Sequence, residues 1–385
     1  MTDRSISGAS HAARKTRHDV TCFRSRATFS AVRRGSSPGC GPANEPPKPS
    51  SLPDTATSAS PKPPSPSSRP STGRDAASEP IRRRVICHRR GEAPGPTLLC
   101  IASLHGNEPA GTLALERVDA ALRAAEVEIE RGELVFLIGN LGALAAGKRY
   151  LDRDLNRGWS REAIARIRAL GPRVSEDLEM LELDDKIEEC QQTARGPLLF
   201  LDLHTTSAAS PPFASVVDQS EARRLSRSLP VPTVLGMDSH LDGTLLEELD
   251  AHDFCGIIFE GGQHDEPEAV DHDEAAVWLL LQQLDFLPAT PPAAVSRRIA
   301  WAHATLSAAA GSLPRLLEIE YRHAIDASCG FHMEPGFRSF EEVEPGQLLG
   351  RDRDGEVRSP FAARVLMPLY QAQGDDGFFL VREVD

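Results

Sequence analysis

PTLLCIASLHGNEPAG, at residues 96–111, combines a predicted strand with a turn that carries polar residues. Its first half is an apolar run of strand length, and its second half is a turn of small and polar residues. A short apolar run bounded by a turn is typical of a strand that is buried on both faces of a sheet. His105 and Glu108 follow this strand directly. Since α/β sheets bind their ligands at strand ends, both residues are candidates for function.

Similar apolar segments occur on both sides of this stretch. Further strands are predicted at residues 82–91, 133–140, 196–207, 212–217 and 254–262. Helical periodicity runs through residues 112–132, ending at Gly132, and a strongly apolar helix is predicted at 273–287. Apolar strands that alternate with helices predict an α/β fold with a largely buried sheet.

The composition changes twice along the chain. Residues 1–78 are predicted to be a disordered extension, because a segment so rich in Pro and Ser cannot bury enough apolar surface to offset its ordering entropy. Residues 79–292 hold the α/β pattern and are predicted to form the main domain. From residue 293 to 385, short strand-like pieces broken by turn residues predict a small β-rich domain.

The net charge of -13 is unevenly distributed. Residues 1–80 carry about +6, and the remainder carries about -19. An acidic body argues against nucleic-acid binding as the main function. No stretch approaches 18 consecutive apolar residues, so no membrane span is expected. A small anionic substrate would need local positive charge in such a body, which makes any arginine in a pocket informative.

The cysteines indicate a reducing environment. There are 7 of them, an odd number at wide spacings, and no C-x-x-C motif occurs. This pattern favours free thiols in a cytoplasmic protein over a disulfide framework or a cysteine-based zinc site.

The pairing of His105 with Glu108 in an H-x-x-E motif suggests a metal site. Gly106 is expected to let the backbone bend between them. In LDLHTTS, His204 ends another buried strand, and two histidines with one glutamate make an open catalytic zinc site. Asp202 shares a strand face with His204 and could orient its imidazole. The alternative is that these are ordinary structural residues, because H-x-x-E pairs also arise by chance.

Four motifs in order, HGNEPAG, GKRYLDRDLNRGW, LDLHTTS and FEGGQ, resemble those of the succinylglutamate desuccinylase/aspartoacylase family, which is related to zinc carboxypeptidases. The resemblance covers roughly residues 82–385. It implies a mixed sheet flanked by helices, with the C-terminal β-rich domain as a lid over the entrance. It also implies one zinc ion per chain.

The resemblance assigns roles to the residues of these motifs. His105, Glu108 and His204 match the zinc ligands. Arg149 matches the arginine that polarises the scissile carbonyl, and Glu260 matches the general acid/base. The residue chemistry agrees, because burial at a strand end would raise the pKa of Glu260 toward that task.

Asn156 and Arg157 match residues that line the substrate pocket, with Arg157 facing a substrate carboxylate. We therefore expect a small carboxylate-bearing substrate. No second arginine clamp can be assigned in residues 205–255, where the only arginines resemble an exposed helix. A substrate with two acidic groups is disfavoured for that reason, and a less charged acyl compound fits as well.

These observations predict a zinc-dependent amidohydrolase (a deacylase). It would cleave the amide bond of an N-acyl amino acid or similar acyl compound through a zinc-activated water, with Glu260 as general base. The alternatives are a zinc peptidase or esterase with the same site, and a non-catalytic small-molecule-binding relative. A homo-oligomer is possible.

Two acidic segments have simpler interpretations. QHDEPEAVDHDE, with His264 and His272, is expected to be an exposed loop that leads into the helix at 273–287, and a second metal site is the alternative. EDLEMLELDDKIEE, at residues 176–189, is expected to form a helix with a solvated acidic face.

Overall fold

The computed structural model describes residues 83–217, 220–237, 239–326 and 328–384. The predicted extension at residues 1–78 lies outside the described residues. Strands and helices alternate through the first two thirds of the described chain. The described helices are α1 (Ala110–Ala124), α2 (Leu141–Ala146), α3 (Arg161–Leu170), α4 (Ser175–Thr193), α5 (Ser220–Ser226), α6 (Leu245–Asp250), α7 (Pro267–Gln283) and α8 (Ala293–Ala310).

A single 11-stranded sheet, in the order β1-β3-β2-β4-β7-β5-β6-β8-β14-β13-β10, forms the framework. Its strands are β1 (Val85–Arg90), β2 (Ala93–Ala102), β3 (Arg131–Ile138), β4 (Leu198–Thr206), β5 (Phe213–Val216), β6 (Thr233–Leu235), β7 (Phe254–Gln263), β8 (Leu316–Ala324), β10 (Glu342–Val343), β13 (Ala363–Leu366) and β14 (Asp376–Glu383). The central strands β3, β2, β4 and β7 run parallel, whereas β1 is antiparallel to β3, and β5 is antiparallel to β7 but parallel to β6. The mixed sheet predicted from the sequence is confirmed.

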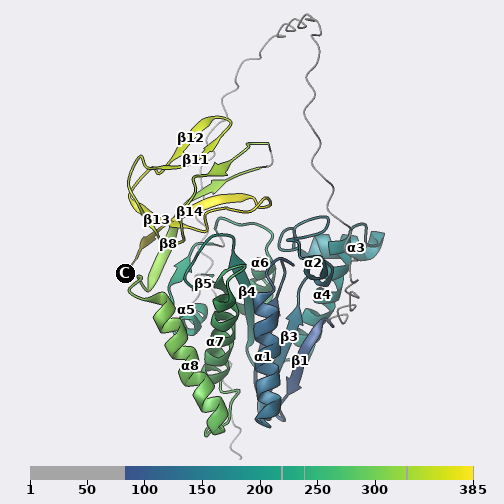
Figure 1. Ribbon diagram of the computed structural model, residues 1–385. Helices are drawn as coiled ribbons and strands as arrows, with labels where there is room; N and C mark the ends of the chain where they lie inside the picture. Colours follow the sequence, from purple (N-terminus) through teal and green to yellow (C-terminus); the bar gives the residue numbers. More distant parts are fainter. Residues whose placement is uncertain (1–82, 218–219, 238, 327, 385) are drawn as a thin grey trace, which may run out of the picture. The chain divides into compact units, whose positions relative to one another are not determined.

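The C-terminal strands extend this sheet and add a second one. β8 pairs in parallel with β6, and β14, β13 and β10 follow as antiparallel neighbours. The separate antiparallel sheet consists of β9 (His332–Met333), β11 (Leu348–Asp352) and β12 (Gly355–Arg358). Figure 1 shows these strands in yellow and green beyond the ends of the central strands. The expectation of a small β-rich C-terminal part is confirmed.

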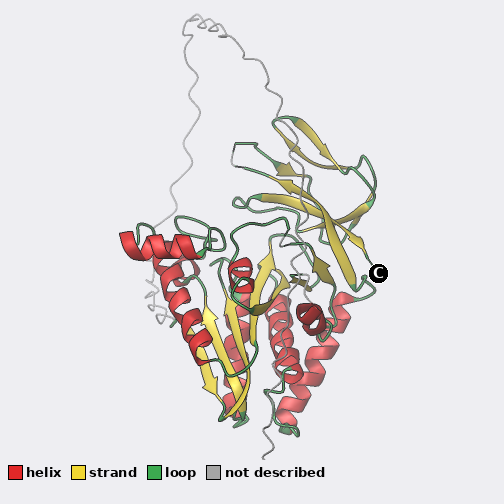
Figure 2. Cartoon of the chain, turned by 180° about the vertical axis from the view of Figure 1, so that it is seen from behind, coloured by secondary structure: helices red, strands yellow, loops and turns green. Residues whose placement is uncertain are grey.

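Helices cover both faces of the central strands. α1, α7 and α8 lie on the face turned to the viewer in Figure 1, and α4 lies on the opposite side, as the reverse view of Figure 2 shows. Strand β2 shows why its sequence is apolar throughout. Leu98 and Cys100 pack in one hydrophobic cluster, whereas Leu99 and Ile101 pack in another, because alternate side chains point to opposite faces.

Two segments differ from the sequence prediction. The helix predicted at 112–132 ends at Ala124, and Glu126 has a positive φ of 51° that breaks it. Val127 and Ile129 then continue the apolar pattern as buried residues of the connection to β3, which extended the apparent helical period. Residues 293–310 form helix α8 rather than β structure, and its Leu306 packs in the same apolar cluster as Trp278 of α7.

The division into residues 79–292 and 293–385 stays a prediction. Among the described residues, no helix combines the length and the apolar character that crossing a membrane requires.

Candidate active site

Three neighbouring parallel strands bring the predicted residues together. His105 and Glu108 lie in the turn after β2, and His204 lies near the end of β4. Glu260 lies on β7 and is the direct register partner of His204. Because the carboxyl ends of parallel strands meet at one edge, side chains far apart in sequence converge there.

The residues that the sequence analysis assigned to metal binding, catalysis and substrate binding line the same pocket. They are His105, Glu108, Arg149, Asn156, Arg157, His204 and Glu260.

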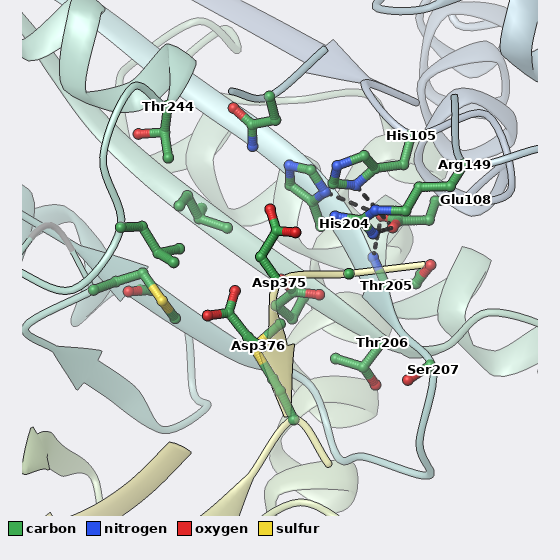
Figure 3. A pocket seen from close by; sticks show the side chains of 18 of the residues that line it. His105, Glu108, Arg149, His204, Thr205, Thr206, Ser207, Thr244, Asp375 and Asp376 are labelled. Atoms are coloured by element: carbon green, nitrogen blue, oxygen red, sulfur yellow. Dashed lines mark hydrogen bonds and ion pairs between the residues drawn. The ribbon is translucent and has the colours of Figure 1, made fainter. Parts of the chain in front are cut away.

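The two histidines and Glu108 form a compact group of potential metal ligands. Their ligand atoms lie within 4.8 Å of one another, and all three residues are buried. Glu108 Oε1 lies 2.9 Å from Nδ1 of His105, and its Oε2 lies 3.0 Å from Nδ1 of His204 (Figure 3). A carboxylate and two imidazole nitrogens that converge away from water fit the ligand set of catalytic zinc.

Each histidine also has a carboxylate at its other ring nitrogen. Asp154 Oδ1 lies 3.1 Å from Nε2 of His105. Asp202 Oδ2 lies 3.0 Å from Nε2 of His204, which is the neighbour relation that the strand period predicts, although the approach lacks hydrogen-bond geometry. Carboxylates in this position orient a ligand imidazole and leave Nδ1 free for a metal. The three potential ligands and the carboxylates beside the two imidazoles therefore both fit a zinc site.

The pKa values of Glu108 and His204 depend on how close the charged side chains of this group lie to one another. Burial alone would raise the pKa of Glu108, but His105 and His204 hold it well below its ordinary value. Burial alone would lower the pKa of His204, but Asp202 and Glu108 raise it well above its ordinary value. Without a metal the site therefore binds a proton at His204, and metal binding must displace that proton.

Arg149 lies beside the metal-ligand group. Its Nε and Nη2 donate to Oδ2 of Asp154 over 3.2 and 3.0 Å, and its Nη1 lies 3.5 Å from Oε1 of Glu108. Its carbonyl oxygen accepts a hydrogen bond from the N–H of Gly106 at 3.0 Å. The arginine loop and the ligand turn are thus joined directly.

A buried glutamate that the sequence analysis misjudged holds the arginine loop. Glu176 in α4 is fully buried, and its carboxylate accepts the backbone N–H groups of residues 151–153 over 2.7 to 3.2 Å. Asp177 and Asp184 of the same helix are also buried. The prediction that this helix carries a solvated acidic face is therefore wrong for these residues. Glu176 fixes the backbone two residues beyond Arg149.

Asn156 and Arg157 come from the same loop. The buried Asn156 accepts the N–H of Leu245 at 2.9 Å through Oδ1, which holds the loop against α6. Arg157 Nη2 lies 3.5 Å from Oδ2 of Asp376, and its Nε lies 3.9 Å from Oδ2 of Asp375. Contact of either residue with a substrate stays a prediction.

Glu260 faces the pocket in a buried setting among charged residues. The residue is 5% exposed, and its Oε2 has no hydrogen-bond partner among the described residues. Burial raises the pKa of Glu260 to about 8, with Glu108 and Asp202 adding to the rise against His204 and Arg149. A carboxyl group in this state can both take up and release a proton near neutral pH.

The pocket also contains Gln371 and His264, the second of which the sequence analysis assigned to an exposed loop. His264 accepts or donates at 2.7 Å to Oγ1 of Thr205, and its Nε2 lies 3.3 Å from Oε1 of Gln371. Neither His264 nor His272 belongs to a metal-ligand group among the described residues. The expected exposed loop is also wrong in part, since α7 already begins at Pro267 and buries Asp273.

Gly106 is required for packing rather than for bending. Its φ is not among the positive values, but a Cβ at this position would lie 2.0 Å from the carbonyl carbon of Ala143 in α2. We expect Gly106→Ala to displace the turn that carries His105 and Glu108, and to lower both the zinc content and the melting temperature. The control is Gly142→Ala in α2, where the nearest atom to an added Cβ belongs to a side chain at 3.1 Å. Equal zinc content in both variants would contradict this account.

Comparison with known proteins agrees with this geometry. Residues 94–252 match the catalytic-domain family of succinylglutamate desuccinylase and aspartoacylase. A succinylglutamate desuccinylase of Pseudomonas fluorescens is 31% identical over 116 residues, which cover 30% of this chain and 33% of that protein. A probable aspartoacylase of Prochlorococcus marinus is 29% identical over 175 residues, which cover 43% of this chain and 52% of that protein. The chain thus spans about a third to a half of these relatives.

The fold has counterparts among solved structures. The succinylglutamate desuccinylase/aspartoacylase structure from Rhodobacter sphaeroides superposes with a TM-score of 0.55 at 17% identity, covering 76% of this chain and 87% of that one. At this identity the likeness concerns the fold alone. Residues 94–252, which carry the buried His-Glu-His group, thus belong to the catalytic-domain family of succinylglutamate desuccinylase and aspartoacylase.

Proposed function

We propose that the protein is a zinc-dependent amidohydrolase that removes the acyl group from a small N-acyl amino acid or a related acyl compound. The observation that carries the proposal is the gathering of the His105, Glu108 and His204 group with Arg149 and Glu260 in one pocket. Together these residues provide a metal site, a fixed positive charge and a proton-transfer group.

The reaction follows from the positions of these groups. Zinc bound by the three ligands would lower the pKa of a water molecule to about 7 and polarise the substrate carbonyl. Glu260 accepts a proton from the water molecule that attacks the carbonyl carbon, and it delivers this proton to the departing amine. Arg149 stabilises the negative charge that develops on the carbonyl oxygen. Asp154 and Asp202 keep the two imidazoles in place.

The pocket supports a small substrate over a peptide. Residues from the C-terminal strands and their loops, including Met367, Leu369 and Phe379, line it beside the metal-ligand group. Ester hydrolysis would use the same groups and is separated from amide hydrolysis by the choice of substrate.

The test is hydrolysis by the zinc-loaded protein before and after chelation. The substrates are N-acetyl and N-succinyl amino acids, a dipeptide, and an acetate ester. We expect amide cleavage of the acyl amino acids, its loss on chelation, and its return with added zinc. If none of these compounds is cleaved, or if cleavage survives chelation, the proposal is refuted.

Arg149→Ala should lower kcat by about 10²-fold with a smaller change in KM, because the arginine stabilises charge that appears only in the transition state. Arg149→Lys should fall in between, since it retains the charge but not the planar guanidinium. Steady-state kinetics at equal zinc content measure the effect, with the exposed Arg166→Ala as control. A rise in KM alone would reassign Arg149 to substrate binding.

We also propose a cytoplasmic location. The cysteines among the described residues, Cys87, Cys100, Cys190, Cys255 and Cys329, are free thiols, which suits a reducing compartment. The possible homo-oligomer stays a prediction.

A further inference from the structure

Both arginines of the pocket are already engaged with carboxylates of the protein. Arg149 makes two contacts of 3.0 and 3.2 Å with Asp154. Arg157 lies 3.5 Å from Asp376 and 3.9 Å from Asp375. A substrate carboxylate at Arg157 would therefore compete with two acidic side chains for one guanidinium.

The first of these acids, Asp376, is firmly held. It begins β14, and its Oδ1 accepts a hydrogen bond of 2.5 Å from Nε of Arg322 on the neighbouring strand β8. Arg322 is fixed in turn by a 2.5 Å bond from Nη1 to the carbonyl oxygen of His240. Asp376 thus bridges Arg157 and Arg322 and cannot easily move away from the pocket.

The second acid, Asp375, has much less compensation. The 3.9 Å approach of Arg157 is its one ion pair among the described residues, and its side chain is 60% exposed. Figure 3 shows the carboxylates of Asp375 and Asp376 entering the pocket that holds the two histidines. Asp375 thus shares the guanidinium of Arg157 with Asp376, at a distance beyond that of a hydrogen bond, and it is the less firmly paired of the two aspartates.

An independent feature points to a ligand in the same space. Glu260 Oε2 is buried without a hydrogen-bond partner among the described residues, and it lines this pocket together with Asp375. A buried polar atom of this kind normally has a partner, so a bound molecule is expected to supply one. A ligand that fills this pocket therefore extends from the buried Glu260 toward the more exposed Asp375.

We propose that the substrate carries a positively charged group on its amine half and that Asp375 recognises it. The substrate class is then the N-acyl derivative of a basic amino acid or a diamine, rather than of an acidic amino acid. A carboxylate in this position would be repelled by Asp375, whereas an ammonium group would be attracted. This inference rests on the proposed amide hydrolysis, and it replaces the carboxylate-bearing side group that Arg157 alone suggested.

The experiment compares four N-acetyl compounds with similar chains but different charges. They are the acetyl derivatives of glutamate, norleucine and lysine (at the α-amine), and of cadaverine. We expect kcat/KM to be about tenfold higher for the lysine derivative than for the norleucine derivative, and lowest for the glutamate derivative. In Asp375→Asn the ratio between lysine and norleucine derivatives should fall to about one. The matched control is Asp354→Asn, an exposed aspartate in the turn between β11 and β12.

A binding measurement decides the question without turnover. Calorimetry on the zinc-loaded protein should show free lysine binding about tenfold tighter than norleucine, and Asp375→Asn should remove the difference. If acetyl amino acids are cleaved but the glutamate derivative is preferred, or if Asp375→Asn leaves the ratios unchanged, the inference is overturned and the amidohydrolase stands. If nothing is cleaved, the proposed function fails, and the lysine-to-norleucine binding ratio still supports or overturns a cation-selective pocket.

Discussion

Glu260→Gln should reduce turnover by about 10²- to 10⁴-fold while leaving the zinc content unchanged. The glutamine has nearly the same shape but can neither accept nor release the proton. Glu260 is not one of the three metal ligands, so the ligand group stays intact. Measuring kcat and bound zinc in the same preparations separates the two effects. The control is Glu268→Gln, an exposed glutamate in the first turn of α7.

The same substitution should stabilise the metal-free protein at alkaline pH. Burial raises the pKa of Glu260 from 4.5 to about 8, so the folded state holds a proton that the unfolded state has lost between these values. The stabilising contribution of the proton is fully present below pH 4.5 and is lost as the pH rises toward 8. The melting temperature of metal-free Glu260→Gln should therefore exceed that of the wild type by an amount that grows from pH 5.5 to pH 8. A difference in melting temperature that stays constant with pH would contradict the raised pKa of Glu260. Near-normal turnover of the variant would remove Glu260 from the mechanism.

His204→Ala should abolish zinc binding and reduce hydrolysis to background. The imidazole supplies one of only three protein ligands, and its loss leaves the buried carboxylates of Glu108 and Asp202 without their common partner. Elemental analysis should find about one zinc per wild-type chain and far less in the variant. The matched control is His303→Ala, an exposed histidine on α8. Undiminished zinc in His204→Ala would place the metal elsewhere in the protein.

Zinc uptake by the wild type should also depend on pH. The carboxylates of Asp202 and Glu108 outweigh burial and raise the pKa of His204 well above its ordinary value, so a proton must leave this imidazole before its nitrogen can bind metal. We expect the apparent zinc affinity to rise with pH and calorimetry to show proton release on binding. An affinity that is independent of pH between 6 and 8 would contradict the protonation state inferred for the metal-free site.

The metal-ligand group was predictable because each ligand lies at the end of a buried strand or in the turn that follows it. His105, Glu108 and His204 each belong to a short motif, and parallel strands ending at one edge bring such motifs together. The sequence could not show Glu176 as a buried anchor, because its surroundings in α4 are acidic and resemble a solvated helix face. Its carboxylate is stabilised instead by backbone N–H groups of a distant loop.

The C-terminal residues that line the pocket could not be predicted from the sequence for a different reason. Gln371 contacts Asn107 at a separation of 264 residues, and no periodicity or spacing links such positions. Asp375 and Asp376 sit in a GDDG segment that reads as an ordinary turn. Helix α8 was missed because its buried side includes small alanines, Ala302 and Ala310, which give a weak apolar stripe.

The order of strands in the sheet separates the potential metal ligands from the acidic pair Asp375 and Asp376 along the chain. The metal ligands belong to β2 and β4 and the turns that follow them, whereas the acidic pair lies at the start of β14, several strands away in the same sheet. The sheet delivers both to one pocket, although they are encoded more than 160 residues apart. If Asp375 recognises the substrate as proposed, changes in the short segment before β14 would redirect the choice of substrate without touching the His105, Glu108 and His204 group.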